Sequence, residues 1–299
     1  MFTRRHPYLF ALLVMAALGT VSMIFFSITV TALTGEPVDS DGEKVGVIEL
    51  VGAIVDSKQF LEQIKEFREA ESIKAIVVRI DSPGGGVGPS QEIYREIRKT
   101  AAEKKVVASM GSVAASGGYY VAAATDGIVA NPGTITGSIG VIMGYTNFEA
   151  LLEKIGLQPV VIKSGEFKDM GSPVREMKDD ERALLTSLTQ KIHRQFIDDI
   201  AAGRRLEVDR IEPIADGRIF TGQEAKDLGL VDRLGNFQDA VQWAGELGGI
   251  QGEIETVYPE EERPPFIEYL MESALKLVSQ SGLTVRHHPE AKWVPTPNI

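Results

Sequence analysis

The stretch KAIVVRIDSPGGGVGPSQEI, residues 74–93, decides the fold class of this chain. Its first seven residues are mostly apolar and β-branched, which is typical of a strand that is buried on both faces of a sheet. A proline and three consecutive glycines then interrupt the apolar run, and a helical pattern continues over Ser90–Glu103. The stretch therefore predicts a strand, a glycine-rich turn and a helix.

The same order of elements occurs on both sides of this stretch. KVGVIEL precedes a helical pattern over Gln59–Ala70, and KVVASM precedes a short helical pattern over Gly117–Thr125. Strands that alternate with helices of this length indicate βαβ units and a parallel sheet. We therefore expect an α/β fold with mainly parallel sheets.

Further elements are expected downstream of these units. GIVA, GSIGVIM and PVVIK are strand candidates because they are short and apolar, and Phe148–Ile155 is a helix candidate. A long helix is predicted over Asp179–Arg205, because carboxylates at a helix start favour the positive end of its dipole.

The N-terminal run Tyr8–Leu33 has no charged residue and is long enough to cross a bilayer, which takes about 20 apolar residues. A cleaved signal peptide has a shorter apolar core of about 7–15 residues, so we favour an uncleaved, single-pass anchor. Arg4 and Arg5 precede the run, and the positive-inside rule then places the N-terminus in the cytoplasm. The inner (plasma) membrane is therefore the expected location, with the residues after Leu33 on the extracytoplasmic, periplasmic side.

The composition excludes some classes of protein. The chain of 299 residues has 31 basic and 42 acidic residues, a net charge of −11, whereas nucleic-acid binding requires a basic surface. It contains no cysteine, which excludes a disulfide framework and a thiolate metal site.

The glycine loop Gly84–Gly86 leaves backbone N–H groups accessible to a ligand. Phosphate binding is one interpretation, but the sequence matches neither the Walker signature nor G-x-G-x-x-G, because Pro89 follows Gly88. An oxyanion hole for a developing alkoxide fits better, and a plain turn is the structural alternative.

The segment VAASGGYYVA, Val113–Ala122, places Ser116 between a predicted strand and a predicted helix. This order resembles a nucleophile elbow in which Ala114 replaces the first glycine of G-x-S-x-G. The alternative is a small residue in a tight turn.

A serine nucleophile requires a base, and none of the four histidines suits that role. They lie before the apolar run, inside the long charged helix or in the C-terminal tail: His6, His193, His287 and His288. A lysine base must be neutral, so its pKa must fall well below the reference value of about 10.4. Lys163 and Lys168 in VIKSGEFKDMGSP are both candidates, and physical reasoning on the residues alone leaves the choice open.

Five ordered segments resemble the signal peptide peptidase A family of membrane-bound serine proteases, in its short single-domain form. They are DSPGGGV, SMGSVAASGGYYVA, NPGTITGSIGVI, KSGEFKDMGSP and GRIFTGQEAKDLGLVDRLG. The resemblance implies a fold of the Clp protease and crotonase group and a Ser-Lys dyad, with Ser116 as nucleophile and Lys168 as general base. It also implies that the backbone N–H groups of Gly85 and Gly117 form the oxyanion hole, and that no metal or organic cofactor is needed.

The function implied by the resemblance is a serine endopeptidase that degrades released signal peptides and other apolar peptides at the membrane. The implied partners are peptide substrates, the lipid bilayer and further copies of the chain in a homo-oligomer. Two alternatives share the fold: a crotonase-like acyl-CoA enzyme and an inactive membrane scaffold. Both leave the presence of Ser116 and Lys168 unexplained, which favours the protease.

These expectations divide the chain into four parts. Residues 1–33 form the cytoplasmic N-terminus and the anchor, 34–44 a linker, and 45–250 the catalytic domain. Residues 251–299 form a C-terminal extension with an amphipathic helix and a loose tail.

Overall fold

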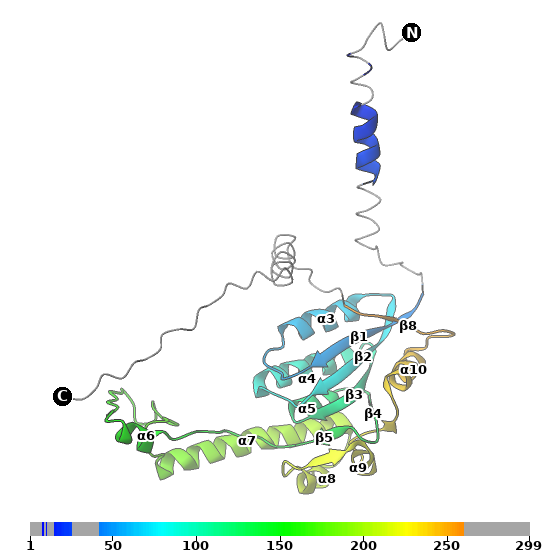
Figure 1. The fold of residues 1–299 in the computed structure, drawn as a ribbon. Helices are drawn as coiled ribbons and strands as arrows, with labels where there is room; N and C mark the ends of the chain where they lie inside the picture. Colours follow the sequence, from blue (N-terminus) through cyan, green and yellow to red (C-terminus); the bar gives the residue numbers. More distant parts are fainter. Residues whose placement is uncertain (1–7, 9, 11–14, 26–41, 260–299) are drawn as a thin grey trace, which may run out of the picture. The chain divides into compact units, whose positions relative to one another are not determined.

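A mainly parallel sheet forms the centre of the fold, with helices against it (Figure 1). The strands are β1 (Lys44–Val51), β2 (Ile73–Ser82), β3 (Lys105–Ala115), β4 (Gly127–Ala130), β5 (Ile135–Gly137), β6 (Ile219–Thr221), β7 (Arg233–Leu234) and β8 (Glu255–Val257). Their order is β6-β5-β3-β2-β1-β8, and β4 pairs with both β3 and β7. Within the described residues only the β5–β6 pair is antiparallel, so the predicted α/β class with a mainly parallel sheet is confirmed.

The helices follow the strands closely in the chain. They are α3 (Lys58–Glu69), α4 (Val87–Ala101), α5 (Gly117–Ala122), α6 (Glu149–Lys154), α7 (Asp179–Arg204), α8 (Val208–Ile211), the 3-10 turn η1 (Glu212–Ile214), α9 (Gly222–Asp227) and α10 (Phe237–Gly248). The predicted strand-and-helix units correspond to β1-α3, β2-α4 and β3-α5, and the long predicted helix corresponds to α7.

Both faces of the central strands are buried, as the continuous apolar runs predict. Alternate β2 residues such as Ile76 and Val78 pack in the core that contains the α3 and α4 side chains Ile64 and Ile97. Val77, between them, packs on the opposite face in the core that contains α10. The carboxyl ends of β2 and β3, where the glycine loop and Ser116 follow, are thus fixed by two cores.

Residues 141–178, which make up most of the segment between β5 and α7, are called the arm below. The arm contains α6 but no strand, so the predictions of a strand over GSIGVIM beyond Gly137 and over PVVIK are wrong. The physical reason is that their apolar side chains lack cover: Ile142, Val160 and Ile162 are 95%, 85% and 97% exposed. No neighbouring strand of the described chain accepts their backbone hydrogen bonds.

The computed structural model describes residues 8, 10, 15–25 and 42–259. Residues 15–25 are helical, and no helix in these ranges is both long and apolar enough to span a bilayer. Half of the predicted anchor lies outside the described residues, as do most of the linker and the whole of the predicted C-terminal helix and tail.

Candidate active site

Ser116 lies at the sharp turn from β3 to α5 with φ of 53° and ψ of −120°. A positive φ is unusual for a residue with a side chain and marks a strained backbone. Two hydrogen bonds hold the turn: Ser116 N–H donates to the carbonyl of Gly137 at 2.8 Å, and Tyr120 N–H donates to the carbonyl of Ser116 at 2.9 Å. This geometry supports the elbow interpretation over that of an ordinary turn serine.

The glycine loop is fixed by the backbone of Ile54. Ile54 N–H donates to the carbonyl of Gly84 at 3.0 Å, and Gly86 N–H donates to the carbonyl of Ile54 at 2.7 Å. A Cβ atom on Gly85 would lie only 2.2 Å from the Ile54 carbonyl oxygen, so no side chain fits there. The loop is therefore held at a separation from Ile54 that only glycine permits.

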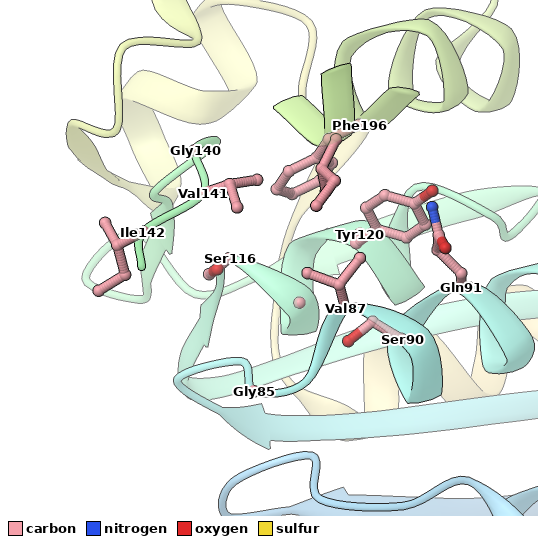
Figure 2. Close-up of a pocket in the computed structure, with 12 residues that line it drawn as sticks. Gly85, Val87, Ser90, Gln91, Ser116, Tyr120, Gly140, Val141, Ile142 and Phe196 are labelled. Carbon is pink, nitrogen blue, oxygen red and sulfur yellow. The ribbon is translucent and has the colours of Figure 1, made fainter. Parts of the chain in front are cut away.

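Gly117 approaches this loop equally closely. A Cβ atom on Gly117 would lie 2.5 Å from Ser90 Oγ and 3.2 Å from Gly85 N. Gly85, Ser116 and Gly117 also line one cavity of about 110 Å³ (Figure 2). The structure thus brings the predicted nucleophile and both predicted oxyanion donors together.

Most of the remaining residues that line this cavity are apolar or aromatic. The remaining lining residues are Val87, Ser90, Gln91, Tyr120, Gly140, Val141, Ile142, Ile192 and Phe196. Figure 2 shows Val141 and Phe196 pointing into the space next to Ser116. A cavity of this size and lining suits an apolar side chain of a bound peptide.

Aromatic rings stabilise the back of the cavity. The Tyr120 ring lies 4.6 Å from that of Phe196 and 5.1 Å from that of Tyr94, measured between ring centroids. The hydroxyl of Tyr120 donates to the carboxylate of Asp199. The hydroxyl of Tyr94 donates to the backbone carbonyl of Asp199 at 2.7 Å. Burial raises the pKa of Tyr94 to about 12 and also raises the pKa of Tyr120, so both phenols are neutral at physiological pH.

Lys168 lies on the arm, where its N–H donates to the carbonyl of Gly165 at 3.2 Å, and it is exposed. It is not among the residues that line the Ser116 cavity of the same chain, and its role as base stays a prediction. The other candidate, Lys163, forms an ion pair with Asp169 at 2.6 Å. His193, which belongs to the described part of the chain, does not line the cavity either.

Sequence reasoning missed several residues of the site. Ser90, which is 3% exposed, donates through its hydroxyl to the carbonyl of Gly86 at 2.8 Å and so supports the glycine loop. Its position was detectable, because Ser90 shares the buried stripe of α4 with Ile93, Tyr94 and Ile97. Phe196 carried no such signal, since it reaches the cavity from a helix far along the chain.

Serine hydrolases typically place the nucleophilic serine in a strained turn between a parallel strand and a helix, beside a loop of accessible backbone amides. The comparison with known proteins agrees with this class and narrows it. The chain belongs to peptidase family S49, whose profile matches residues 98–251, and the profile of Clp protease matches residues 44–134.

Individual relatives are also proteases by name. A Synechocystis sp. protein, provisionally named as a protease, is 45% identical over 82% of this chain and 90% of its own length. The chloroplastic serine protease SPPA of Arabidopsis thaliana is 38% identical over 69% of this chain and 30% of its own length. An Enterococcus faecium protein, provisionally named signal peptide peptidase SppA, is 37% identical over 62% and 54%, respectively. The chain thus spans only part of two of these three relatives.

Proposed function

We propose that this chain is a membrane-anchored serine endopeptidase that uses Ser116 and Lys168 to cleave apolar peptides, above all signal peptides released into the membrane. The observation that carries the proposal is the backbone of Ser116, whose positive φ presents the residue beside Gly85 and Gly117 in an apolar cavity. The cavity lining supports an apolar substrate. The name of the Enterococcus faecium relative supports signal peptides as the substrate class.

The reaction is amide hydrolysis through an acyl-enzyme. Neutral Lys168 accepts the proton of the Ser116 hydroxyl as Oγ attacks the substrate carbonyl, and the N–H groups of Gly85 and Gly117 donate to the resulting oxyanion. Protonated Lys168 then returns the proton to the leaving amine, and the C–N bond breaks. Water, deprotonated by Lys168, hydrolyses the ester and releases Ser116.

The position of Lys168 supports a dyad formed between two copies of the chain. Lys168 does not line the cavity of its own chain, and the arm that carries it exposes a large apolar surface. This surface includes Ile142, Val160, Val161, Ile162 and Phe167. Exposed apolar patches of this kind mark interaction sites. Lys168 of one copy therefore serves Ser116 of a neighbour in a homo-oligomer.

The anchor is Tyr8–Leu33, as the charge-free apolar run and the preceding arginines predict. It holds the protease at the periplasmic face of the inner membrane, within reach of peptides that remain in the bilayer. Fractionation and protease shaving of spheroplasts test this part separately. A domain protected from external protease would contradict the proposed orientation.

The catalytic proposal is tested with the full chain, a leucine-rich peptide and the variants Ser116→Ala and Lys168→Ala. We expect each variant to lose at least about 1000-fold in kcat, because both act on the reacting atoms. Wild-type activity in either variant would contradict the dyad, and an inactive wild type would favour a scaffold. A pH profile that still climbs near 10.4, about the reference value for lysine, would count against a lysine base.

A further inference from the structure

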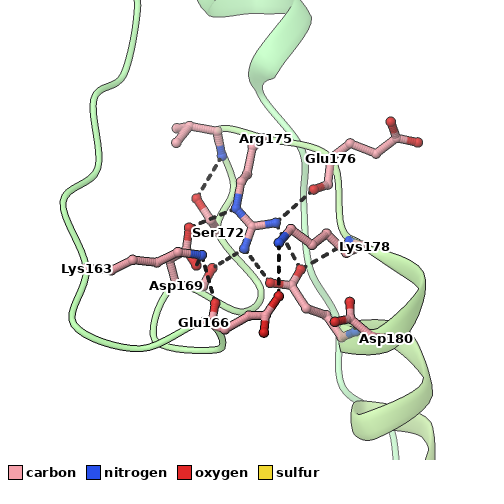
Figure 3. A network of polar contacts seen from close by, with 10 residues as sticks. Lys163, Glu166, Asp169, Ser172, Arg175, Glu176, Lys178 and Asp180 are labelled. Atoms are coloured by element: carbon pink, nitrogen blue, oxygen red, sulfur yellow. Dashed lines mark hydrogen bonds and ion pairs between the residues drawn. The ribbon is translucent and has the colours of Figure 1, made fainter.

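A network of ion pairs on the arm surrounds the residue that follows Lys168 in the chain (Figure 3). The carboxylate of Asp169 accepts hydrogen bonds from Arg175 Nε at 2.8 Å and from Lys163 Nζ at 2.6 Å. Lys163 Nζ also donates to the carbonyl of Glu166 at 2.7 Å. The turn that carries Lys168 is thus held by its own charged side chains.

Arg175 connects this turn to the long helix α7. Its Nη1 atom donates to Glu181 Oε2 at 2.9 Å and its Nη2 atom donates to Glu181 Oε1 at 2.5 Å. Glu181 is fully buried in the first turn of α7 and also accepts from Lys178 N–H at 3.1 Å. A planar guanidinium that uses all three nitrogens in this way fixes both partners in direction as well as distance.

We propose that Arg175 is a positioning residue for the general base Lys168, because it fixes the Lys168 turn on α7 and neutralises the carboxylate of Asp169. The proposal rests on the dyad proposed above. It assigns Arg175 no contact with the substrate, since the guanidinium nitrogens are bound to Asp169 and Glu181.

The carboxylate of Asp169 has to be neutralised because it is next to Lys168 in the chain. A carboxylate beside a lysine favours the protonated lysine, which cannot accept the serine proton. Hydrogen bonds from Arg175, and then from Lys163, lower the pKa of Asp169, because both cations stabilise its charged form. The side chains that form ion pairs around the turn are Lys163, Glu166, Asp169, Arg175, Lys178 and Glu181, three of each sign, with Lys178 paired to Glu166 at 3.7 Å. The carboxylates of Glu176 and Asp180 lie beside them (Figure 3).

The test measures kcat, KM and the pH dependence of kcat/KM for the full chain with a leucine-rich peptide. In Arg175→Gln we expect kcat to fall about 10- to 100-fold and KM to change less than about twofold, since the base is misplaced but the cavity is intact. The part of the kcat/KM profile that rises with pH should move to higher pH by about half a unit to one unit, because Asp169 keeps only Lys163 of its two cationic partners.

Two further variants separate geometry from charge. When Asp169→Asn is added to Arg175→Gln, the rising part of the kcat/KM profile should return towards its wild-type pH, while kcat stays low. Arg175→Lys keeps the positive charge but loses the planar set of guanidinium donors. It should leave the rising part of the kcat/KM profile at its wild-type pH and recover only part of kcat. The matched control is Arg194→Gln, which removes an exposed α7 arginine bound to Asp198 and Glu212 and should change nothing.

The outcomes distinguish this proposal from the dyad itself. Wild-type kcat and pH profile in Arg175→Gln, with Ser116→Ala and Lys168→Ala inactive, would overturn the positioning role alone. A loss of kcat with no shift in the rising part of the kcat/KM profile, together with an altered oligomer in native mass spectrometry, would also overturn it, since Arg175 would then act only in assembly. Active Ser116→Ala and Lys168→Ala variants would remove the dyad and this proposal together.

Discussion

Individual glycines decide whether the site can form. A backbone in the strained region that Ser116 occupies costs about 1–3 kcal/mol, which the surrounding structure must offset. It does so through contacts that leave no room for a side chain at Gly85 or Gly117. The strained conformation of Ser116 therefore requires glycine at both position 85 and position 117.

Gly117→Ala should abolish most activity without unfolding the protein. The added Cβ atom would lie 2.5 Å from Ser90 Oγ and 3.2 Å from Gly85 N, which pushes apart the two proposed oxyanion donors. We expect kcat to fall at least about 100-fold, as when one oxyanion donor is lost. A peptide-cleavage assay measures the loss of activity, and a thermal melt checks that the protein stays folded.

The matched control is Gly88→Ala, because a Cβ atom there meets nothing within 4 Å. This variant should keep wild-type activity. Equal losses in both variants would show that glycine matters here for a reason other than the separation of the donors.

At the scale of elements, α7 completes a cavity that β3 and α5 begin. Its residues Ile192 and Phe196 form part of the apolar wall, and Phe196 packs on Tyr120 of α5. The helix thereby sets how large a substrate side chain can lie next to Ser116.

Ile192→Ala should shift specificity towards larger side chains. The truncation enlarges the cavity, so the ratio of kcat/KM for a phenylalanine peptide to that for a leucine peptide should rise about 10-fold. Leu188→Ala, on α7 but outside this cavity and 44% exposed, should leave the ratio unchanged. An unchanged ratio in Ile192→Ala would place the substrate side chain elsewhere.

The attachment of the arm to α7 should fail in acid. Hydrogen bonds from Arg175 lower the pKa values of both Asp169 and Glu181, with Lys163 adding to the effect on Asp169. A lowered folded-state pKa contributes stability above the unfolded value, about 4, and that stability is lost as the pH falls through the folded value.

Hydrogen exchange over residues 163–178 measures this attachment. After correction for intrinsic rates, protection should be equal at pH 5 and pH 7.5 and should fall below about pH 4. The buried strand β2 serves as the internal reference. Protection of the arm that persists unchanged to pH 3 would contradict a role for these carboxylates.

At the scale of the whole molecule, a site completed by a neighbour should be restored by mixing inactive copies. Ser116→Ala and Lys168→Ala are each expected to be inactive. Mixed and reassembled in equal amounts, they should regain about a quarter of the wild-type activity, since one neighbour pairing in four has both groups. Mixing the double variant with Lys168→Ala supplies no Lys168 and should restore nothing. An inactive mixture with confirmed exchange of subunits would place the dyad within one chain.

The sequence predicts those features that depend on local pattern. The β1-α3, β2-α4 and β3-α5 units, the glycine loop and the Ser116 turn follow from periodicity and turn residues, and the structure contains all of them. The strand prediction for PVVIK is wrong because an apolar run does not by itself distinguish a buried strand from a segment whose side chains bind another surface.

The remaining parts depend on contacts between distant segments. Phe196 lies eighty residues after Ser116, and no local pattern indicates that they share a cavity. The Arg175 network depends on how the arm turns against α7, so the sequence alone does not show that this loop arginine binds both Asp169 and Glu181.

The length of α7 has a consequence for how the active sites are spaced. Fifteen residues separate Glu181, where the arm is attached, from Phe196 at the cavity, and a helix rises about 1.5 Å per residue, so about 22 Å lies between them. In the proposed homo-oligomer, this length of helix holds the Lys168 turn of each chain apart from the Ser116 cavity of the same chain. It would also set the spacing at which neighbouring copies bring Lys168 to Ser116, so a change in the length of α7 should disturb every site of the assembly together.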